Sequence, residues 1–285
     1  MRIANVSGRL TLLDGDAGID VERASNGVFS ADPAAVYLRW DEFRLWVTQL
    51  EPDEKVCDAT IDPHSFGPPS PQPRQVFAIG ANYHDHVAEA GVAPPKTMEV
   101  FTKYPTCVVG PYAEVPLPGK RIDWEAELVV IIGRHAHHVP AELSWDYVAG
   151  VTAGQDFSCR KTQFAGSQFS LSKSFPAFGP TGPWLRTVDE LPDRDNVAIQ
   201  CSVNGDLVQR GSTADMIYSV PEAIARLSAI VPLLPGDLIF TGTMAGVGAF
   251  RKPPRFLAPG DEVTTEVAGM AMRNRCVPQG GATSR

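Results

Sequence analysis

One stretch constrains the fold more than any other. Asp123–Leu128 carries alternating acidic residues and runs directly into the apolar run Val129–Ile132, which a glycine closes. An apolar, β-branched run closed by glycine is typical of a buried strand. Because side chains alternate along a strand, Asp123, Glu125 and Glu127 are predicted to share one face.

Three like charges on a strand that enters a core are costly unless a cation neutralises them. Carboxylate oxygens suit Mg²⁺ or Mn²⁺, and Ca²⁺ is a further candidate. The alternative interpretation is an edge strand whose acidic face is solvated. The stretch by itself leaves both interpretations open.

Composition excludes several classes of partner. The 285 residues carry a net charge of −8 with no basic block, so nucleic acid is not expected as a partner. No apolar run approaches the ~20 residues needed to span a bilayer, and the N-terminus lacks the apolar core of a signal peptide, so no membrane partner is expected. The five cysteines are dispersed without C-x-x-C spacing, which argues against a disulfide framework and a zinc site. We therefore expect a reduced, cytoplasmic protein.

The order of elements predicts a β-rich α+β fold with a small N-terminal domain, because short strands dominate and no βαβ rhythm appears. Residues 1–62 are predicted to form a small α/β unit, with a strand-like stretch over Arg2–Leu13, a hairpin turn at Asp14-Gly15 and a helix over 33–50. Residues 63–74 are proline-rich and predict an extended linker. Residues 75–278 would be the main domain and 279–285 a disordered tail.

Several elements of the main domain have clear sequence signals. Asp85 is predicted to cap a short helix that Gly91 ends, and Asn204-Gly205 predicts a tight hairpin turn. Residues 221–231 predict an amphipathic helix, and Glu262–Val267 is predicted as the final strand. The glycine-rich loop over 241–248 lacks the Lys-Ser/Thr pair of a P-loop, so we expect no nucleotide there, although a small anion remains compatible.

Two groups of polar residues predict chemistry. His86 and Glu89 lie three apart on the expected helix, so the carboxylate can orient the imidazole as a general base. A surface ion pair is the alternative. Asp156 follows an apolar strand and is either a helix cap or a ligand, while Arg160 and Gln163 lie one turn further on and can donate to a carboxylate or carbonyl group. Lys173 sits among apolar residues and has a snorkelling surface lysine as its alternative.

Taken together, these motifs resemble the fumarylacetoacetate hydrolase family. They cover about residues 75–276, and they occur in the family's order. The motifs are Gly80-x-Asn82-Tyr83-x-x-His86-x-x-Glu89, Asp123-Trp124-Glu125-x-Glu127-Leu128, Asp156-x-Ser158-x-Arg160 with Gln163, Lys173-Ser174-Phe175, Val203-Asn204-Gly205, and Pro235-Gly236-Asp237 with Thr241-Gly242-Thr243.

The resemblance implies a roll of mixed β-sheets, assembled as a homodimer. It implies that the metal ligands are Glu125, Glu127 and Asp156, with Asp123 left outside the ligand set. It further implies an acid/base dyad on a segment that closes over the substrate, and four residues that line the substrate site. The dyad is His86 and Glu89, and the lining residues are Arg160, Gln163, Lys173 and Thr243.

Two positions depart from the family's usual pattern. Pro176 follows Lys173-Ser174-Phe175, where many members have aspartate, and Met244 follows Thr243, where many members have proline. We expect both residues to border the pocket and to alter the substrate preference.

The family's chemistry predicts a metal-dependent hydrolase of an acylpyruvate-like 2,4-diketo acid, of the kind found in the catabolism of aromatic compounds. Chelation of the 1,3-dicarbonyl by Mg²⁺ or Mn²⁺ would stabilise the enolate that leaves when the carbon–carbon bond breaks. His86 would activate water, while Lys173 and Arg160 would stabilise the oxyanion and hold the substrate carboxylate. The alternatives are decarboxylation of an oxaloacetate-like acid, isomerisation of an unsaturated oxo acid, and a binding protein without catalysis.

Overall fold

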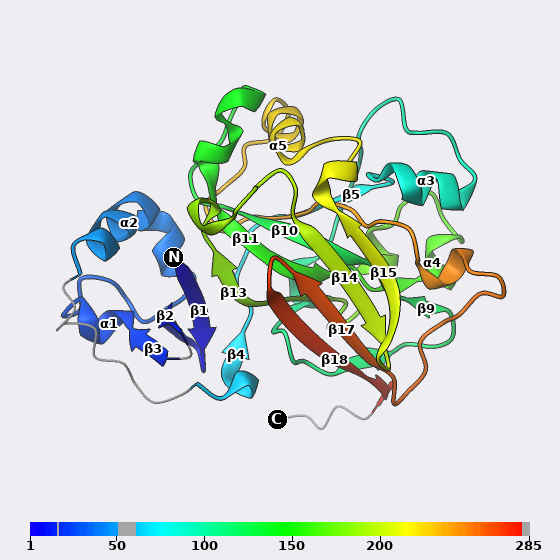
Figure 1. Cartoon of the computed structure of the whole chain (residues 1–285), viewed down its shortest axis with the longest axis horizontal. Coiled ribbons are helices and arrows are strands. Elements are labelled where there is room, and N and C mark those ends of the chain that lie inside the picture. The colour runs from blue at the N-terminus through cyan, green and yellow to red at the C-terminus, as the bar shows by residue number, and fades with distance from the viewer. Residues whose placement is uncertain (16, 51–60, 281–285) are drawn as a thin grey trace.

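The computed structural model describes residues 1–15, 17–50 and 61–280. These residues form three β-sheets with short helices at their edges, as Figure 1 shows. The predicted β-rich α+β fold is confirmed. The part of the predicted tail from residue 281 onwards lies outside the described residues, as does the stretch from 51 to 60 of the predicted N-terminal unit.

The large sheet has eleven strands and mixes parallel with antiparallel pairs. Its main path runs in the order β3-β2-β1-β13-β11-β10-β16-β5-β6, with β4 beside β1 and β7 beside β13. In chain order the strands are β1 (Arg2–Val6), β2 (Arg9–Asp14), β3 (Ala17–Asp20), β4 (Phe66–Gly67), β5 (Val76–Gly80), β6 (Glu99–Thr102), β7 (Val108–Val109), β10 (Ala126–Ile132), β11 (Val148–Gln155), β13 (Gly179–Arg186) and β16 (Leu238–Phe240).

A five-stranded sheet covers one face of the large sheet, in the order β15-β14-β17-β18-β8. Its strands are β8 (Val115–Leu117), β14 (Ala198–Val203), β15 (Asp206–Ser212), β17 (Glu262–Val267) and β18 (Met270–Pro278). A two-stranded sheet joins β9 (Ile122–Asp123) to β12 (Ser158–Cys159).

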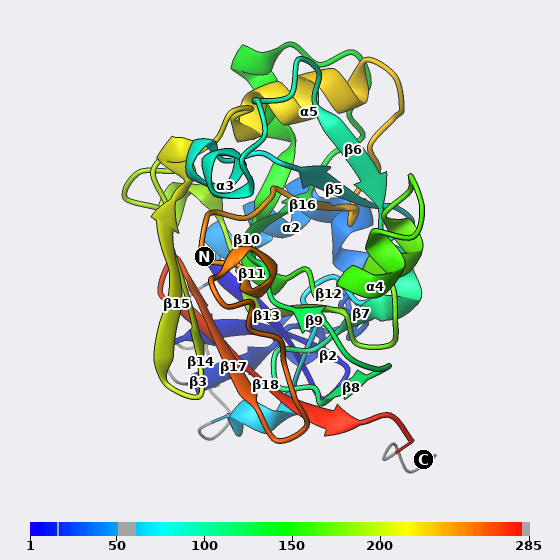
Figure 2. The ribbon, with the colours of Figure 1, turned by 90° about the vertical axis from the view of Figure 1, so that its right-hand side faces the viewer.

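The helices are short. The α-helices are α1 (Val21–Ala24), α2 (Trp40–Thr48), α3 (His84–Ala90), α4 (Arg160–Gln163) and α5 (Val220–Ser228). The 3₁₀ turns are η1 (Ala35–Arg39), η3 (Pro63–Ser65), η4 (Pro105–Cys107), η5 (Ala141–Tyr147), η6 (Ser170–Lys173), η7 (Val188–Glu190), η8 (Thr213–Asp215) and η9 (Gly248–Phe250). The helices α3 and α4 lie at the end of the molecule opposite the N-terminal strands (Figures 1 and 2).

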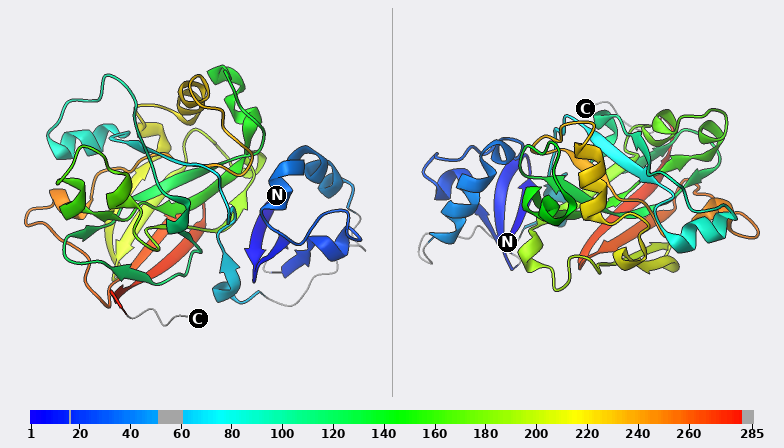
Figure 3. Two further views of the ribbon diagram at one scale, coloured as in Figure 1. Left: turned by 180° about the vertical axis from the view of Figure 1, so that it is seen from behind. Right: turned by 90° about the horizontal axis from the view of Figure 1, so that it is seen from above.

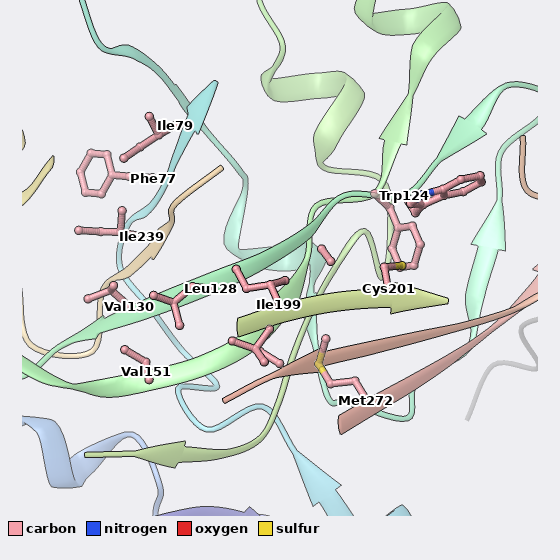
Figure 4. Close-up of a cluster of buried hydrophobic side chains, with 14 of the residues drawn as sticks. Phe77, Ile79, Trp124, Leu128, Val130, Val151, Ile199, Cys201, Ile239 and Met272 are labelled. Atoms are coloured by element: carbon pink, nitrogen blue, oxygen red, sulfur yellow. The ribbon is translucent and has the colours of Figure 1, made fainter. Parts of the chain in front are cut away.

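Strand β10 is the centre of the molecule, and its residues are buried on both faces. Leu128 and Val130 belong to the core between the two larger sheets, together with Ile199 and Met272, and Figure 4 labels all four side chains. Val129 belongs to the second core, on the side of the N-terminal unit. A strand covered on both faces needs apolar residues at every position, which explains the continuous run that the sequence shows.

The acidic stretch is not one strand, and this corrects the predicted alternation. Strand β9 ends at Asp123, β10 begins at Ala126, and Trp124 and Glu125 between them belong to neither strand. Asp123 instead pairs in register with Ser158 of β12. The three acidic side chains therefore do not share one strand face.

The N-terminal unit is joined to the large sheet, because β1 pairs with β13 (Figure 3). The stretch over Arg2–Leu13 is two strands that turn at Ser7 and Gly8, both of which have positive φ. The expected helix over 33–50 is correct only from Trp40 onwards, since η1 precedes it.

The proline-rich segment 63–74 is not a free linker. Its strand β4 pairs with β1, the Tyr37 hydroxyl donates to the carbonyl of Pro69, and the Ser70 hydroxyl donates to the carbonyl of Gly236. The segment thus ties the N-terminal unit to the main sheet.

Two further predictions need correction. Tyr83, not Asp85, is the N-cap of α3, although Gly91 does end that helix in the left-handed conformation. Glu262–Val267 is not the last strand, because β18 follows it after a turn at Ala268 and Gly269. Among the described residues, the structure contains no helix that is long and apolar enough to cross a membrane.

Candidate active site

Three buried carboxylates meet where β10 begins and β11 ends. Each of Glu125, Glu127 and Asp156 has a carboxylate oxygen within 4.8 Å of an oxygen of the other two. The backbone N–H of Asp156 donates to the carbonyl of Glu125 over 2.9 Å, and the side chain of Gln155 accepts from the N–H of Glu125 over 2.9 Å. Backbone pairing between two strands, rather than alternation along one strand, therefore brings the three groups together.

Two buried lysines neutralise part of this cluster. Lys173 Nζ lies 2.6 Å from Glu125 Oε2 and 2.6 Å from Asp156 Oδ2. Lys103 Nζ lies 2.6 Å from Asp156 Oδ1 and donates to the carbonyls of Lys173 and Phe178. Both lysines are almost fully buried, so neither is a snorkelling surface residue.

Asp123 belongs to a separate ion pair. Its Oδ2 lies 2.8 Å from Arg160 Nη2 and accepts from the N–H of Ala249, and its Oδ1 accepts from the N–H of Gly248. Arg160 Nη2 also lies 2.8 Å from Glu125 Oε1. Asp123 thus pairs with Arg160 and accepts hydrogen bonds from backbone N–H groups, and it is not part of the three-carboxylate cluster.

Glu127 is the carboxylate without a cation. Within the described part of the chain, its partner is the N–H of Gly242, which donates to Oε2 over 2.7 Å. When all groups are ionised, four carboxylates, counting Asp123, face three cations at this buried centre, so one negative charge is left over. A divalent cation held by Glu125, Glu127 and Asp156 would offset this charge, and oxygen-only ligands suit Mg²⁺ or Mn²⁺. The residues present therefore fit such an ion.

The pKa values of the two glutamates move in opposite directions. Burial and the charges of Asp156 and Glu125 hold the pKa of Glu127 well above its usual value. Burial also opposes ionisation of Glu125, but Lys173 and Arg160 outweigh it and hold the pKa of Glu125 at about 2. Burial acts to lower the pKa of Lys173. The charges of Asp156 and Glu125 outweigh burial, so the pKa of Lys173 is raised. In the absence of metal, the cluster thus favours the ionised form of Glu125 and the protonated form of Glu127.

Metal binding is accordingly expected to release a proton. A metal ion needs the carboxylate form of Glu127, whereas the raised pKa keeps this residue neutral at any pH below that pKa. The apparent affinity for Mn²⁺ should therefore increase as the pH rises toward the pKa of Glu127. Calorimetric titration in buffers of different ionisation enthalpy measures both quantities. An affinity that is independent of pH, without proton release, would contradict the assignment.

Lys103 is a residue that the sequence analysis missed. Nothing in the pattern around it distinguishes it from a surface lysine, and its partner Asp156 is 53 positions away.

Lys103→Met removes a buried charge partner of Asp156, which typically costs about 3–5 kcal/mol in the free energy of unfolding. Urea unfolding of the metal-free protein measures the loss. The exposed Lys96 provides a matched control, since Lys96→Met should stay within about 0.5 kcal/mol of the wild type. Equal stability of the two variants would show that Lys103 is dispensable.

His86 and Glu89 lie beside this cluster on α3. His86 Nδ1 is 3.7 Å from Glu89 Oε2, and the two side chains are 13% and 21% exposed. Both oxygens of Glu89 accept from the N–H of Gly246, and Asp85 accepts from the N–H of Ala245. The glycine-rich loop therefore holds α3 in place and orients the carboxylate that faces the imidazole.

One pocket of about 210 Å³ unites most of the predicted site residues. Its polar lining includes His86, Glu125, Arg160, Gln163, Lys173 and Thr243. Glu89 contacts this pocket through His86, and Glu127 and Asp156 complete the cluster next to Glu125.

Two of these lining residues form hydrogen bonds with other protein groups. Gln163 Oε1 accepts from Arg160 over 2.8 Å. The Thr243 hydroxyl donates to the carbonyl of Ala126 and accepts from Gln209, so its proton is not free for a substrate.

The two positions that depart from the family pattern do not border this pocket, contrary to expectation. Met244 is fully buried in the core, where it packs against Gly211. Pro176 is exposed and is not among the lining residues. Neither substitution alters the wall of the pocket directly.

Curated relatives match the main part of the chain. The chain is 44% identical to oxaloacetate tautomerase FAHD2A of Homo sapiens over 207 residues, which are 71% of this chain and 66% of that protein. It is 43% identical to oxaloacetate tautomerase Fahd2a of Rattus norvegicus over 206 residues, with the same two shares. The chain thus matches slightly less than two thirds of the length of these relatives.

Solved structures match nearly the whole chain. An HpcE-like protein from Mycobacterium smegmatis has a TM-score of 0.91 and 44% identity, covering 98% of this chain and 99% of that one. Maleylpyruvate hydrolase from Sphingobium sp. SYK-6, in complex with manganese(II) and pyruvate, has a TM-score of 0.80 and 27% identity, covering 98% and 100%. The family model of the fumarylacetoacetate hydrolase C-terminal domain matches residues 75–277. By this match, and by the site that the same residues form, the chain belongs to the fumarylacetoacetate hydrolase family.

Proposed function

We propose that this protein is a divalent-metal-dependent enzyme that interconverts the keto and enol forms of a 2-oxo acid. One observation carries the proposal: a buried carboxylate cluster, in which Glu127 has no cation partner among the described residues, borders the same pocket as a histidine. A metal site beside a proton carrier is the arrangement that enolisation needs. The identity of 43–44% to two oxaloacetate tautomerases supports this choice of reaction.

Glu125, Glu127 and Asp156 would hold Mg²⁺ or Mn²⁺, and the manganese in the maleylpyruvate hydrolase structure supports an ion of this class. When bound, the ion would act as a Lewis acid that polarises the carbonyl group of the 2-oxo acid. With Glu127 ionised, the bound ion would give the centre one net positive charge, which favours an anionic substrate.

His86 would carry the proton. Because Nδ1 faces Glu89, Nε2 is the nitrogen left for the substrate. Nε2 would take the proton from the carbon next to the carbonyl group and return it to the oxygen, and the reverse reaction would use the same atoms. Glu89 would stabilise the imidazolium form that exists between the two transfers.

Lys173 and Arg160 would hold the negative charge that develops on the substrate. Both line the pocket and carry buried positive charges, which act more strongly there than in water. Each is fixed by carboxylates of the cluster, so little reorganisation is needed during the reaction.

A second candidate is hydrolysis of a carbon–carbon bond in an acylpyruvate. The observation that favours it is the His86–Glu89 pair, which is suited to taking a proton from water. The water oxygen would bond to the distal carbonyl carbon, and the electron pair of the broken bond would remain on the enolate fragment, which then takes up a proton. The similarity to a maleylpyruvate hydrolase supports this alternative.

One assay separates these functions. Enol oxaloacetate and acylpyruvates absorb in the ultraviolet, so the purified protein with Mn²⁺ or Mg²⁺ should accelerate the loss of this absorbance, and a chelator should stop it. Unchanged mass with altered absorbance indicates tautomerisation, and two acids as products indicate hydrolysis. No acceleration with any oxo acid, in protein that has bound metal, would refute the proposed function.

A further inference from the structure

The pocket beside the carboxylate cluster has two unlike ends. One end carries the charged groups Glu125, Arg160 and Lys173. The rest of the wall is mainly apolar and aromatic, and it comes from β5, α3, β6, the α4–η6 segment and η9. Its largest members are Phe101, Phe164, Phe169 and Phe250.

The apolar wall begins directly at the charged end. Lys173 Nζ lies 5.2 Å from the centre of the Phe101 ring, and the Phe169 ring packs edge-on against Phe101 at 5.8 Å. The Phe250 ring, also part of the lining, lies 5.7 Å from the imidazole of His86. A substrate held at the carboxylate cluster would therefore extend between aromatic side chains.

The two cations at this pocket lie beside the carboxylate cluster, where the 2-oxo acid part of a substrate would be held. Arg160 forms ion pairs with Asp123 and Glu125, and Lys173 forms ion pairs with Glu125 and Asp156. The remaining charged group of the wall away from the cluster is Glu99, for which the described residues provide no hydrogen bond or ion pair. A carboxylate at the far end of a substrate would meet apolar rings and a like charge, which is unfavourable.

We infer that this protein prefers 2-oxo acids with an uncharged apolar substituent over those with a second carboxylate at the far end. The 2-oxo acid part lies at the carboxylate cluster, and the substituent lies between Phe101, Phe164 and Phe169. This inference rests on the proposed function for the placement of the 2-oxo acid. It goes beyond that function because it names what occupies the remainder of the pocket.

Burial of apolar surface sets the size of the effect. Each methylene group moved from water into an apolar site improves affinity by roughly three- to fourfold. Lengthening an apolar tail by two methylenes should therefore tighten binding roughly tenfold, until the tail reaches the mouth of the pocket.

Unreactive mimics test the inference without turnover. Oxamate and its N-ethyl and N-butyl derivatives can be titrated calorimetrically into Mn²⁺-loaded protein, alongside N-oxalylglycine, which has a carboxylate on its tail. Affinity should rise along the alkyl series, and N-oxalylglycine should bind more weakly than the N-ethyl derivative. Glu99→Lys should improve the binding of N-oxalylglycine and leave the alkyl series unchanged.

Phe164 is a suitable residue to vary, because it is 61% exposed and the variant should fold. Phe164→Ala should reduce the gain per methylene, and Phe164→Leu should retain most of it. Leu171 is 67% exposed and does not line the pocket, so Leu171→Ala serves as the matched control and should behave as the wild type.

The outcomes are distinct. Equal affinity along the alkyl series, or tighter binding of N-oxalylglycine, would overturn the inference. If the series shows the expected gain but no 2-oxo acid is converted, the proposed function fails and the preference for an apolar substituent stands. If no oxamate binds to the loaded protein, both are refuted.

Discussion

Glu127→Gln is expected to abolish binding of the divalent metal and to leave the metal-free protein at least as stable as the wild type. Glutamine keeps the shape of the side chain and its acceptor for the Gly242 N–H but removes the charge that would hold the ion. Glu127 has a raised pKa in the folded protein, so the folded state binds a proton that the unfolded state has already released. That difference lowers stability as the pH rises from the unfolded pKa toward the folded one, and the substitution removes it.

Thermal unfolding with and without Mn²⁺ measures both parts of this prediction. The wild type should gain stability with increasing Mn²⁺, because the ion binds only the folded state, and Glu127→Gln should gain none. Catalytic activity should be lost together with the metal. A Glu127→Gln variant that still binds Mn²⁺ with the affinity of the wild type would show that the ligand set is wrong.

Asp156→Asn provides the contrast within the same cluster. It should also lose the metal, but it leaves the buried ammonium groups of Lys103 and Lys173 without their shared carboxylate. Breaking such a buried pair typically costs about 3–5 kcal/mol, so this variant should be destabilised even without metal. The comparison separates a ligand that only the metal needs from one that also holds the fold together.

His86→Ala is expected to reduce kcat by about 10²- to 10⁴-fold, which is the usual contribution of a general acid or base. Metal binding should be retained, because the imidazole is not part of the three-carboxylate cluster. The rate constant for the loss of ultraviolet absorbance and the Mn²⁺ affinity are the two measurements.

The helix that carries His86 also supplies the control. His84 lies on α3 as well but is exposed and outside the pocket, so His84→Ala should leave kcat unchanged. Glu89→Gln should have an intermediate effect, since it keeps an acceptor for the Gly246 N–H and removes the charge beside the imidazole. If His86→Ala converts the substrate at the rate of the wild type, another group carries the proton.

Much of the architecture follows from local patterns. The run Val129–Ile132 predicts a buried strand because a strand covered on both faces has apolar residues throughout. The hairpin at Asn204-Gly205 and the helix near 221–231 also have local causes, a two-residue turn with positive φ and an amphipathic repeat. The predicted helix over 33–50 failed before Trp40, where the local signal is weak and η1 forms instead. The contacts of the proline-rich segment had no local signal, because its partners, such as Gly236, lie far away in the sequence.

The sequence by itself determined the chemical character of the site: an acidic stretch at the head of a buried strand, a histidine three residues from a glutamate, and a set of motifs that identify the family. Only the tertiary structure decided how the charges are distributed. The break at Trp124 and Glu125 separates Asp123 from β10, and Lys103, which follows the end of β6, neutralises Asp156. Burial makes each of these charges costly unless a partner lies within a few ångströms, and such partners are brought together by strand pairing between remote segments, which no local pattern records.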